Sequence, residues 1–124
     1  PAEQLAANVV ANDAEVERLI ALAKAHPHTV CAVAVGNEAA VDWTDHLVPV
    51  ERIRAQVRRV RAAGVHQPVT VCDNHVPWVH GDLAGLADDL DFLSLHTYPL
   101  WEHKPLHEVV QRALIAKAHA IGPF

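Results

Sequence analysis

Apolar residues recur at helical spacing near the start of the chain and again in its middle. From about Ala2 to Ala25 they follow the period of an amphipathic helix, which His26-Pro27 ends. A second helix is expected after Pro49, closed by Gly64. Its apolar stripe is Val50, Ile53, Val57 and Val60, and the arginines off that stripe predict a solvated face (Arg52, Arg54, Arg58, Arg59 and Arg61).

Three short apolar runs alternate with the helical segments and predict strands that are buried on both faces. They cover residues 29–35, 68–73 and 90–98. A short helix is expected over residues 81–90, and a last helix from Pro105 to just before Gly122. Strands separated by helices indicate parallel βα units, so the predicted class is α/β, in a single partial domain over residues 1–124.

Each predicted strand is followed by polar or aromatic residues. They are Asn37 and Glu38, then Asp73, Asn74 and His75, then His96, Thr97 and Tyr98. Loops at the carboxyl ends of parallel strands carry the active sites of α/β folds. Taken singly, Glu38 is more often a helix cap or a surface acid, and His75 or His96 a structural histidine. Their coincidence after three consecutive strands favours a functional site.

The composition limits the classes of partner and cofactor that are expected. The net charge of -5 is spread along the 124 residues without a basic patch, which argues against nucleic acid. No apolar run is long enough to span a membrane. Neither HExxH nor a paired-cysteine motif occurs, so no metal or other cofactor is expected; metal capture by His46, His75, His96 and His103 is the weaker alternative. The sequence has no methionine, so the chain is expected to be a processed product or an excerpt.

The motifs VGNE, VTVCDNHVPW and LDFLSLHTYPLWE, in this order, resemble the central part of a bacterial member of glycoside hydrolase family 17. These are β-1,3-glucanase-related (β/α)₈ enzymes. The resemblance implies about half of a TIM barrel, approximately strands four to six with their flanking helices. It also implies a β-glucan or an oligosaccharide as partner, and a bacterial parent protein that is secreted, periplasmic or membrane-attached.

The resemblance further implies roles for individual residues. Glu38 matches the general acid/base, Asn37 the partner of the sugar 2-hydroxyl, and Tyr98 the tyrosine that orients the nucleophile. A mostly apolar site is expected to raise the pKa of Glu38 for proton donation. Trp101, and less surely Trp78, match a stacking platform for a pyranose ring. The remaining expected substrate contacts are Asp73, Asn74, His96 and Glu102, the last of which is alternatively a solvated acid.

One departure from the family limits the expected activity. Retaining hydrolysis needs a second carboxylate about 5 Å from the first. In the family this is a glutamate on strand seven, whereas the chain ends at Phe124, where that strand would begin. The chain is therefore interpreted as a hydrolase or transglycosylase fragment that has the acid/base, lacks the nucleophile and is inactive alone. The alternative is a non-catalytic carbohydrate-binding or self-associating half-barrel.

If these 124 residues are the whole molecule, a homo-oligomer is expected, most simply a two-fold dimer. Two open sheet edges and an apolar inner face would otherwise stay exposed. That expected inner face consists of Cys31 or Ala32, Val33, Val35, Val69, Val71, Phe92 and Leu95.

Overall fold

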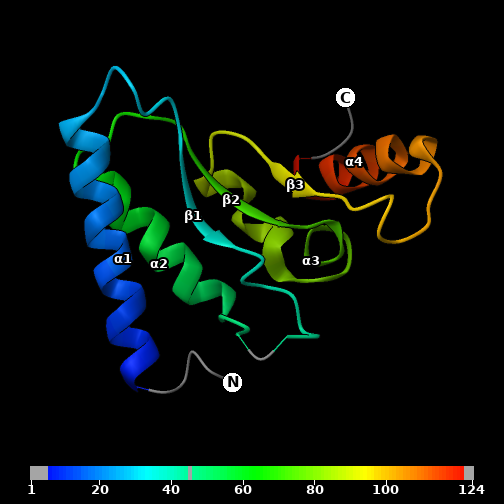
Figure 1. Cartoon of the computed structure of the whole chain (residues 1–124), viewed down its shortest axis with the longest axis horizontal. Helices are drawn as coiled ribbons and strands as arrows, with labels where there is room; N and C mark the ends of the chain where they lie inside the picture. Colours follow the sequence, from blue (N-terminus) through cyan, green and yellow to red (C-terminus); the bar gives the residue numbers. More distant parts are fainter. Residues whose placement is uncertain (1–5, 45, 122–124) are drawn as a thin grey trace.

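The structure of the protein, a computed structural model, describes residues 6–44 and 46–121. Its elements in chain order are α1 (Ala6–Ala25), β1 (Val33–Asn37), α2 (Val50–Ala62), β2 (Val69–Asn74), α3 (His75–His80), the 3₁₀ helix η2 (Asp82–Asp89), β3 (Ser94–His96) and α4 (Leu106–Ile121). The strands form a parallel sheet in the order β1-β2-β3, with helical segments between them (Figure 1). The predicted α/β class with parallel βα units is confirmed.

Some predicted bounds differ from those observed: the first strand, expected over residues 29–35, covers Val33–Asn37. The part of the first predicted helix before Ala6 lies outside the described residues. The third strand is much shorter than residues 90–98, because Asp91 uses its carboxylate to accept the Val69 N–H at 2.7 Å. Residues 75–80 form the unpredicted helix α3, which starts directly after β2 because the Asn74 side chain caps it.

The apolar side chains of the strands are buried beneath the helices. Val33 and Val35 of β1 form one core cluster with Val69 and Val71 of β2. The helix residues in this cluster include Val16, Ile20, Ile53, Val57 and Val60. The expectation that the four valines line an inner face is therefore wrong, since α1 and α2 already bury them.

The opposite side of the sheet, called the open face, carries smaller and more polar residues. The strand register and the two-residue period place Ala34 beside Thr70, and Cys72 beside Ser94, on this face. The other residues of the expected inner face are exposed or half-buried (Cys31, Ala32, Phe92 and Leu95). The open face is thus a weaker hydrophobic surface than the sequence pattern predicts.

The arginines of α2 join it to its neighbours. They form ion pairs with Asp13 and Glu17 of α1 on one flank (Arg52 and Arg59), and with Asp89 and Asp91 on the other (Arg54, Arg58 and Arg61). Figure 1 shows α1 and α2 side by side. The expected solvated face is therefore a set of connections between elements. Within residues 6–44 and 46–121, no helix is long and apolar enough to cross a membrane.

Candidate functional site

Three side chains meet at the carboxyl edge of the sheet. The Tyr98 hydroxyl donates a hydrogen bond to Glu38 Oε1 at 2.6 Å. Nδ1 of His96 lies 3.1 Å from the same oxygen and 3.2 Å from the Tyr98 hydroxyl. We call these residues the Glu38 cluster. They come from the ends of β1 and β3, the two outer strands of the sheet, so the folded sheet is required to bring them together.

The backbone around Glu38 is irregular. A bulge interrupts the pairing of β1 with β2 between Ala34 and Asn37, and Gly36 has a φ of 97°. Glu38 itself has a φ of 48°, in the left-handed region that glutamate rarely occupies, and its N–H donates to the Cys72 carbonyl at 2.9 Å. Contacts around the turn must therefore hold this conformation.

Asp73 supplies one of those contacts. It is fully buried, and its Oδ2 accepts the backbone N–H of Ala40 at 2.9 Å. Its Oδ1 accepts the N–H of Asn74 at 2.8 Å. Burial raises the pKa of Asp73, and the nearby negative charge of Glu38 acts in the same direction. Asp73 thus fixes the turn that carries Glu38 and has no surface to offer a ligand.

The two partners of Glu38 are placed by strand periodicity. His96 pairs with Asn74 at the end of β3, and Tyr98 follows two residues later. Residues two apart in an extended chain point to the same side, so both side chains reach Glu38. Their rings meet edge to face, with centroids 5.9 Å apart and planes at 66°.

The hydrogen bonds set the charge of Glu38. The Tyr98 hydroxyl is the largest cause and lowers the pKa of Glu38. Burial is the next largest and opposes it, and His96 and His46 lower the pKa further, so that the net shift is downward. The Glu38 side chain keeps 30% of its surface exposed, which limits that opposing effect. The expected raised pKa of Glu38 is therefore wrong for this chain. The same hydrogen bond raises the pKa of Tyr98, so the phenol stays a neutral donor.

Four other expected substrate contacts are used inside the fold. Asp73 is buried as described, and Asn74, which is 6% exposed, accepts the Val76 N–H as the cap of α3. Trp78 lies in the core with no exposed surface, because α3 turns its ring inward. Glu102 pairs with Arg112 of α4 and ties the loop to that helix. None of them occupies the substrate-facing position that the sequence predicts.

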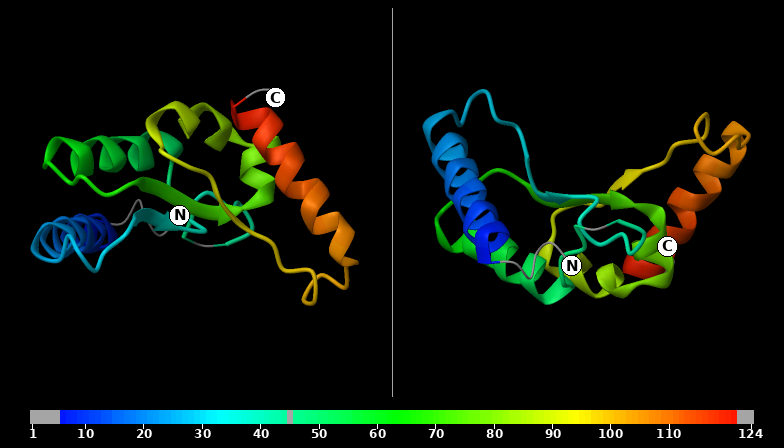
Figure 2. Two further views of the ribbon diagram at one scale, coloured as in Figure 1. Left: turned by 90° about the horizontal axis from the view of Figure 1, so that it is seen from above. Right: turned by 60° about the horizontal axis from the view of Figure 1, so that its bottom comes forward.

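Trp101 keeps the exposure that a stacking platform needs. It is 86% exposed beside Leu100, which is 92% exposed. Figure 2 shows that the connection between β3 and α4, where both lie, extends away from the sheet. Within the described residues, Trp101 makes no hydrogen bond or ring contact with the Glu38 cluster. Its ring is available to a ligand, but the structure does not join it to Glu38.

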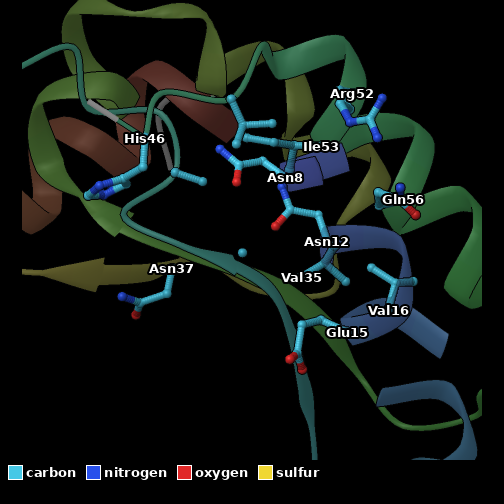
Figure 3. A pocket seen from close by; sticks show the side chains of 13 residues that line it. Asn8, Asn12, Glu15, Val16, Val35, Asn37, His46, Arg52, Ile53 and Gln56 are labelled. Carbon is cyan, nitrogen blue, oxygen red and sulfur yellow. The ribbon is translucent and has the colours of Figure 1, made fainter. Parts of the chain in front are cut away.

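Asn37 also borders a cavity near the candidate site. A cavity of about 420 Å³ lies between α1, α2 and the end of β1 (Figure 3). In Figure 3, Asn8, Asn12 and Glu15 line it from α1, and Arg52, Ile53 and Gln56 line it from α2. Asn37 and His46 complete the rim. Asn37 is exposed, and the cavity lies on the helix side of β1.

Trp43 is a candidate site residue that the sequence pattern does not indicate. This residue is 58% exposed in the connection after β1, five positions beyond Glu38, and it borders another cavity. A tryptophan in a short polar segment directly after a candidate catalytic acid is the signal that would have found it. Among the residues whose side chains the structure describes (8–44 and 46–115), no group of three or more His, Cys, Asp or Glu is arranged to hold a metal ion.

Comparison with known proteins connects the fold to sugar chemistry. The structure is similar to the crystal structure of an endo-laminarinase from Formosa Hel1_33_131, with a TM-score of 0.66 and 29% sequence identity. The match covers 87% of this chain and 34% of the laminarinase, so the chain spans about a third of that protein. No family model and no curated protein sequence matches. The chain therefore has a glucanase-like α/β fold.

Proposed function

We propose that the chain is the central portion of a (β/α)₈ β-glucan glycosidase related to glycoside hydrolase family 17, with Glu38 as the general acid/base. The observation that carries this proposal is the position of Glu38. Its carboxylate lies at the carboxyl edge of a parallel sheet, between a phenol and an imidazole, where α/β enzymes keep their catalytic groups. The similarity to an endo-laminarinase supports β-glucan as the substrate class.

The chemistry assigns Glu38 two successive proton transfers. As an acid, it protonates the glycosidic oxygen while a second carboxylate attacks the anomeric carbon. As a base, it then takes a proton from the water that hydrolyses the glycosyl intermediate, or from a sugar hydroxyl in transfer. Asn37 would bind the sugar 2-hydroxyl, and Trp101 would stack on a ring. This two-carboxylate reaction uses no metal or organic cofactor.

The lowered pKa of Glu38 is understandable when the nucleophile is missing. A second carboxylate about 5–5.5 Å away would repel the Glu38 anion and raise its pKa. It would also compete for the Tyr98 hydroxyl, which lies next to Glu38 in this chain. We therefore propose that the acid form of Glu38 becomes available only in the complete site, and that the isolated chain does not hydrolyse glucan.

A non-catalytic role in sugar binding is the second candidate. Its support is the low pKa of Glu38, which keeps the carboxylate ionised near neutral pH, and the open ring of Trp101. An ionised acceptor beside an exposed aromatic ring suits the hydroxyls and the C–H face of a pyranose. In this role Glu38 accepts hydrogen bonds and transfers no proton.

Substituting Glu38 in the natural protein that contains these residues separates the two roles. Glu38→Gln is expected to lower kcat/KM on laminarin by roughly 10²–10⁴-fold. It should lower the rate of glycosylation from a dinitrophenyl β-glucoside far less, because that leaving group needs no proton. Glu51→Gln, at an exposed glutamate of α2, is the control and should change neither rate. Equal losses on both substrates would assign Glu38 to nucleophilic attack, and unchanged turnover would leave only the binding role.

A further inference from the structure

A second cavity lies at the carboxyl edge of the sheet, beside the candidate site. It has a volume of about 340 Å³ and is bounded by the connection from β1 to α2 and by α3. Its lining residues include Trp43, Leu47, Pro49, Val76 and Pro77. Its two walls follow the consecutive strands β1 and β2. We call it the Trp43 pocket.

The walls and the rim of the Trp43 pocket differ in chemistry. Valine, leucine and proline side chains form the walls, and the ring of Trp43 is 58% exposed at the edge. Asp42, His80 and Asp82 add exposed polar groups. None of these three side chains forms a hydrogen bond or an ion pair with another described residue, so their polar atoms remain available to a ligand.

This combination matches one sugar ring better than a purely apolar ligand. A pyranose presents a C–H face that packs on an indole ring, and hydroxyls that donate to carboxylates or bond to imidazole. The volume lies in the range of about 300–1,000 Å³ that is usual for small-molecule sites. An apolar peptide segment would cover the carboxylates of Asp42 and Asp82 without offering them hydrogen-bond donors, which would disfavour its binding.

We propose that the Trp43 pocket is a glucosyl subsite distant from the bond that reacts, with Trp43 as its platform and Asp42, His80 and Asp82 as its hydroxyl partners. The inference rests on the proposed function, because it assumes a β-glucan ligand. Trp43 lies five positions after Glu38, and an extended segment of that length spans at most about 17 Å. A single oligosaccharide of a few units can therefore reach from the Glu38 cluster to the pocket.

The subsite predicts how affinity depends on ligand length. Laminari-oligosaccharides from the disaccharide to the hexasaccharide are titrated into the chain by calorimetry. Affinity should rise at the length that first reaches the Trp43 pocket. Trp43→Ala should remove that rise and weaken the hexasaccharide about tenfold, while the disaccharide is unchanged. Trp43→Phe, which keeps a ring, should retain most of the affinity.

One control and one further variant make the test decisive. Leu22→Ala removes an exposed apolar side chain of α1 and should leave all affinities unchanged. Asp82→Asn tests the pocket without removing the ring and should also weaken only the long ligands. If Trp43→Ala and Asp82→Asn bind the hexasaccharide as the wild type does, the subsite is wrong and the proposed function stands. If the wild type binds no laminari-oligosaccharide of any length, the subsite is overturned, while the proposed function is decided separately by the Glu38→Gln kinetics in the natural protein.

Discussion

The carboxylate of Asp73 accepts the backbone N–H of Ala40, two residues beyond Glu38, at 2.9 Å. This hydrogen bond joins β2 to the turn after β1, and its acceptor, Asp73, is fully buried. Asp73 therefore positions the turn of the candidate acid from beneath. Removing a buried acceptor of two backbone hydrogen bonds should lower the free energy of unfolding measurably.

Replacing Asp73 should destabilise the fold and loosen this turn. Asp73→Ala leaves the N–H groups of Ala40 and Asn74 without their acceptor, which should lower the free energy of unfolding by about 1–3 kcal/mol. Asp73→Asn keeps one acceptor oxygen and loses the buried charge, so its effect should be smaller. Urea unfolding measures both variants. Hydrogen exchange at the Ala40 amide should accelerate in Asp73→Ala, and an unchanged exchange rate would contradict the positioning role.

Removing the Tyr98 hydroxyl should raise the pKa of Glu38. The bond from Tyr98 is the largest cause that lowers this pKa, and Tyr98→Phe removes it without removing the ring. NMR titration of the Glu38 side-chain carboxyl carbon measures the change. Trp101→Phe alters an exposed ring in the same connection and should leave the Glu38 titration as it is. A pKa that falls or stays constant in Tyr98→Phe would show that another group holds the charge.

The pairing of Asp89 with Arg54 and Arg58 should make stability fall in acid. These arginines lower the pKa of Asp89, so the folded state binds its proton less readily than the unfolded state does. The stabilisation is therefore present above the unfolded pKa, about 3.9, and is lost as the pH falls through the lower folded value. Asp89→Asn should cost about 1 kcal/mol at pH 7.

The neighbouring residue provides the control for this prediction. Asp88 is exposed and has no side-chain partner among the described residues, so Asp88→Asn should change the free energy of unfolding little. The difference between the wild type and Asp89→Asn should shrink as the pH falls below about 4. A difference that stays constant down to pH 2 would contradict the assignment to the carboxylate charge.

Self-association of the chain should involve α4. Leu106, Val110 and Leu114 are exposed at four-residue spacing on this helix, with exposed fractions of 76%, 58% and 52%. We propose that this stripe and the free edge of β3 form the contact in a dimer of the isolated chain. Sedimentation velocity at micromolar concentrations should detect the dimer, and Leu114→Lys should dissociate it.

A substitution on the other side of the molecule tests whether the effect is specific. Leu22 of α1 is 56% exposed, so Leu22→Lys makes the same chemical change away from α4. It should leave the sedimentation coefficient unchanged. A wild-type chain that sediments as a monomer at every concentration would exclude the dimer.

The order of the elements could be predicted because their patterns are local. The stripe on α2 and the β-branched run of β2 follow from hydrophobic periodicity alone. Periodicity could not say which face of the sheet the helices cover, because a strand buries either set of alternate residues equally well. The face that the valines of β1 occupy therefore becomes known only from their packing with the side chains of α1 and α2.

The part of the candidate site whose position depends only on the ends of the strands could be predicted from the sequence. Glu38, His96 and Tyr98 follow from their positions after parallel strands. Trp78 and Glu102 could not be assigned from the sequence. The direction of Trp78 depends on α3, whose start is fixed by the Asn74 cap, and Glu102 finds its partner Arg112 ten residues away across a turn. Such partners are set by tertiary packing, which leaves no periodic signal.

The left-handed backbone at Glu38 has a consequence for the evolution of related chains. Asparagine and glycine accept a φ of 48° more easily than glutamate does, by about 1 kcal/mol or more. Selection for folding alone would therefore tend to replace the glutamate, so its retention among related chains would require a use for its carboxylate, such as the proton transfer proposed above. Natural homologues with Asn or Gly at this position, and with Asp73 kept beneath it, should be those that have given up proton transfer while preserving the scaffold.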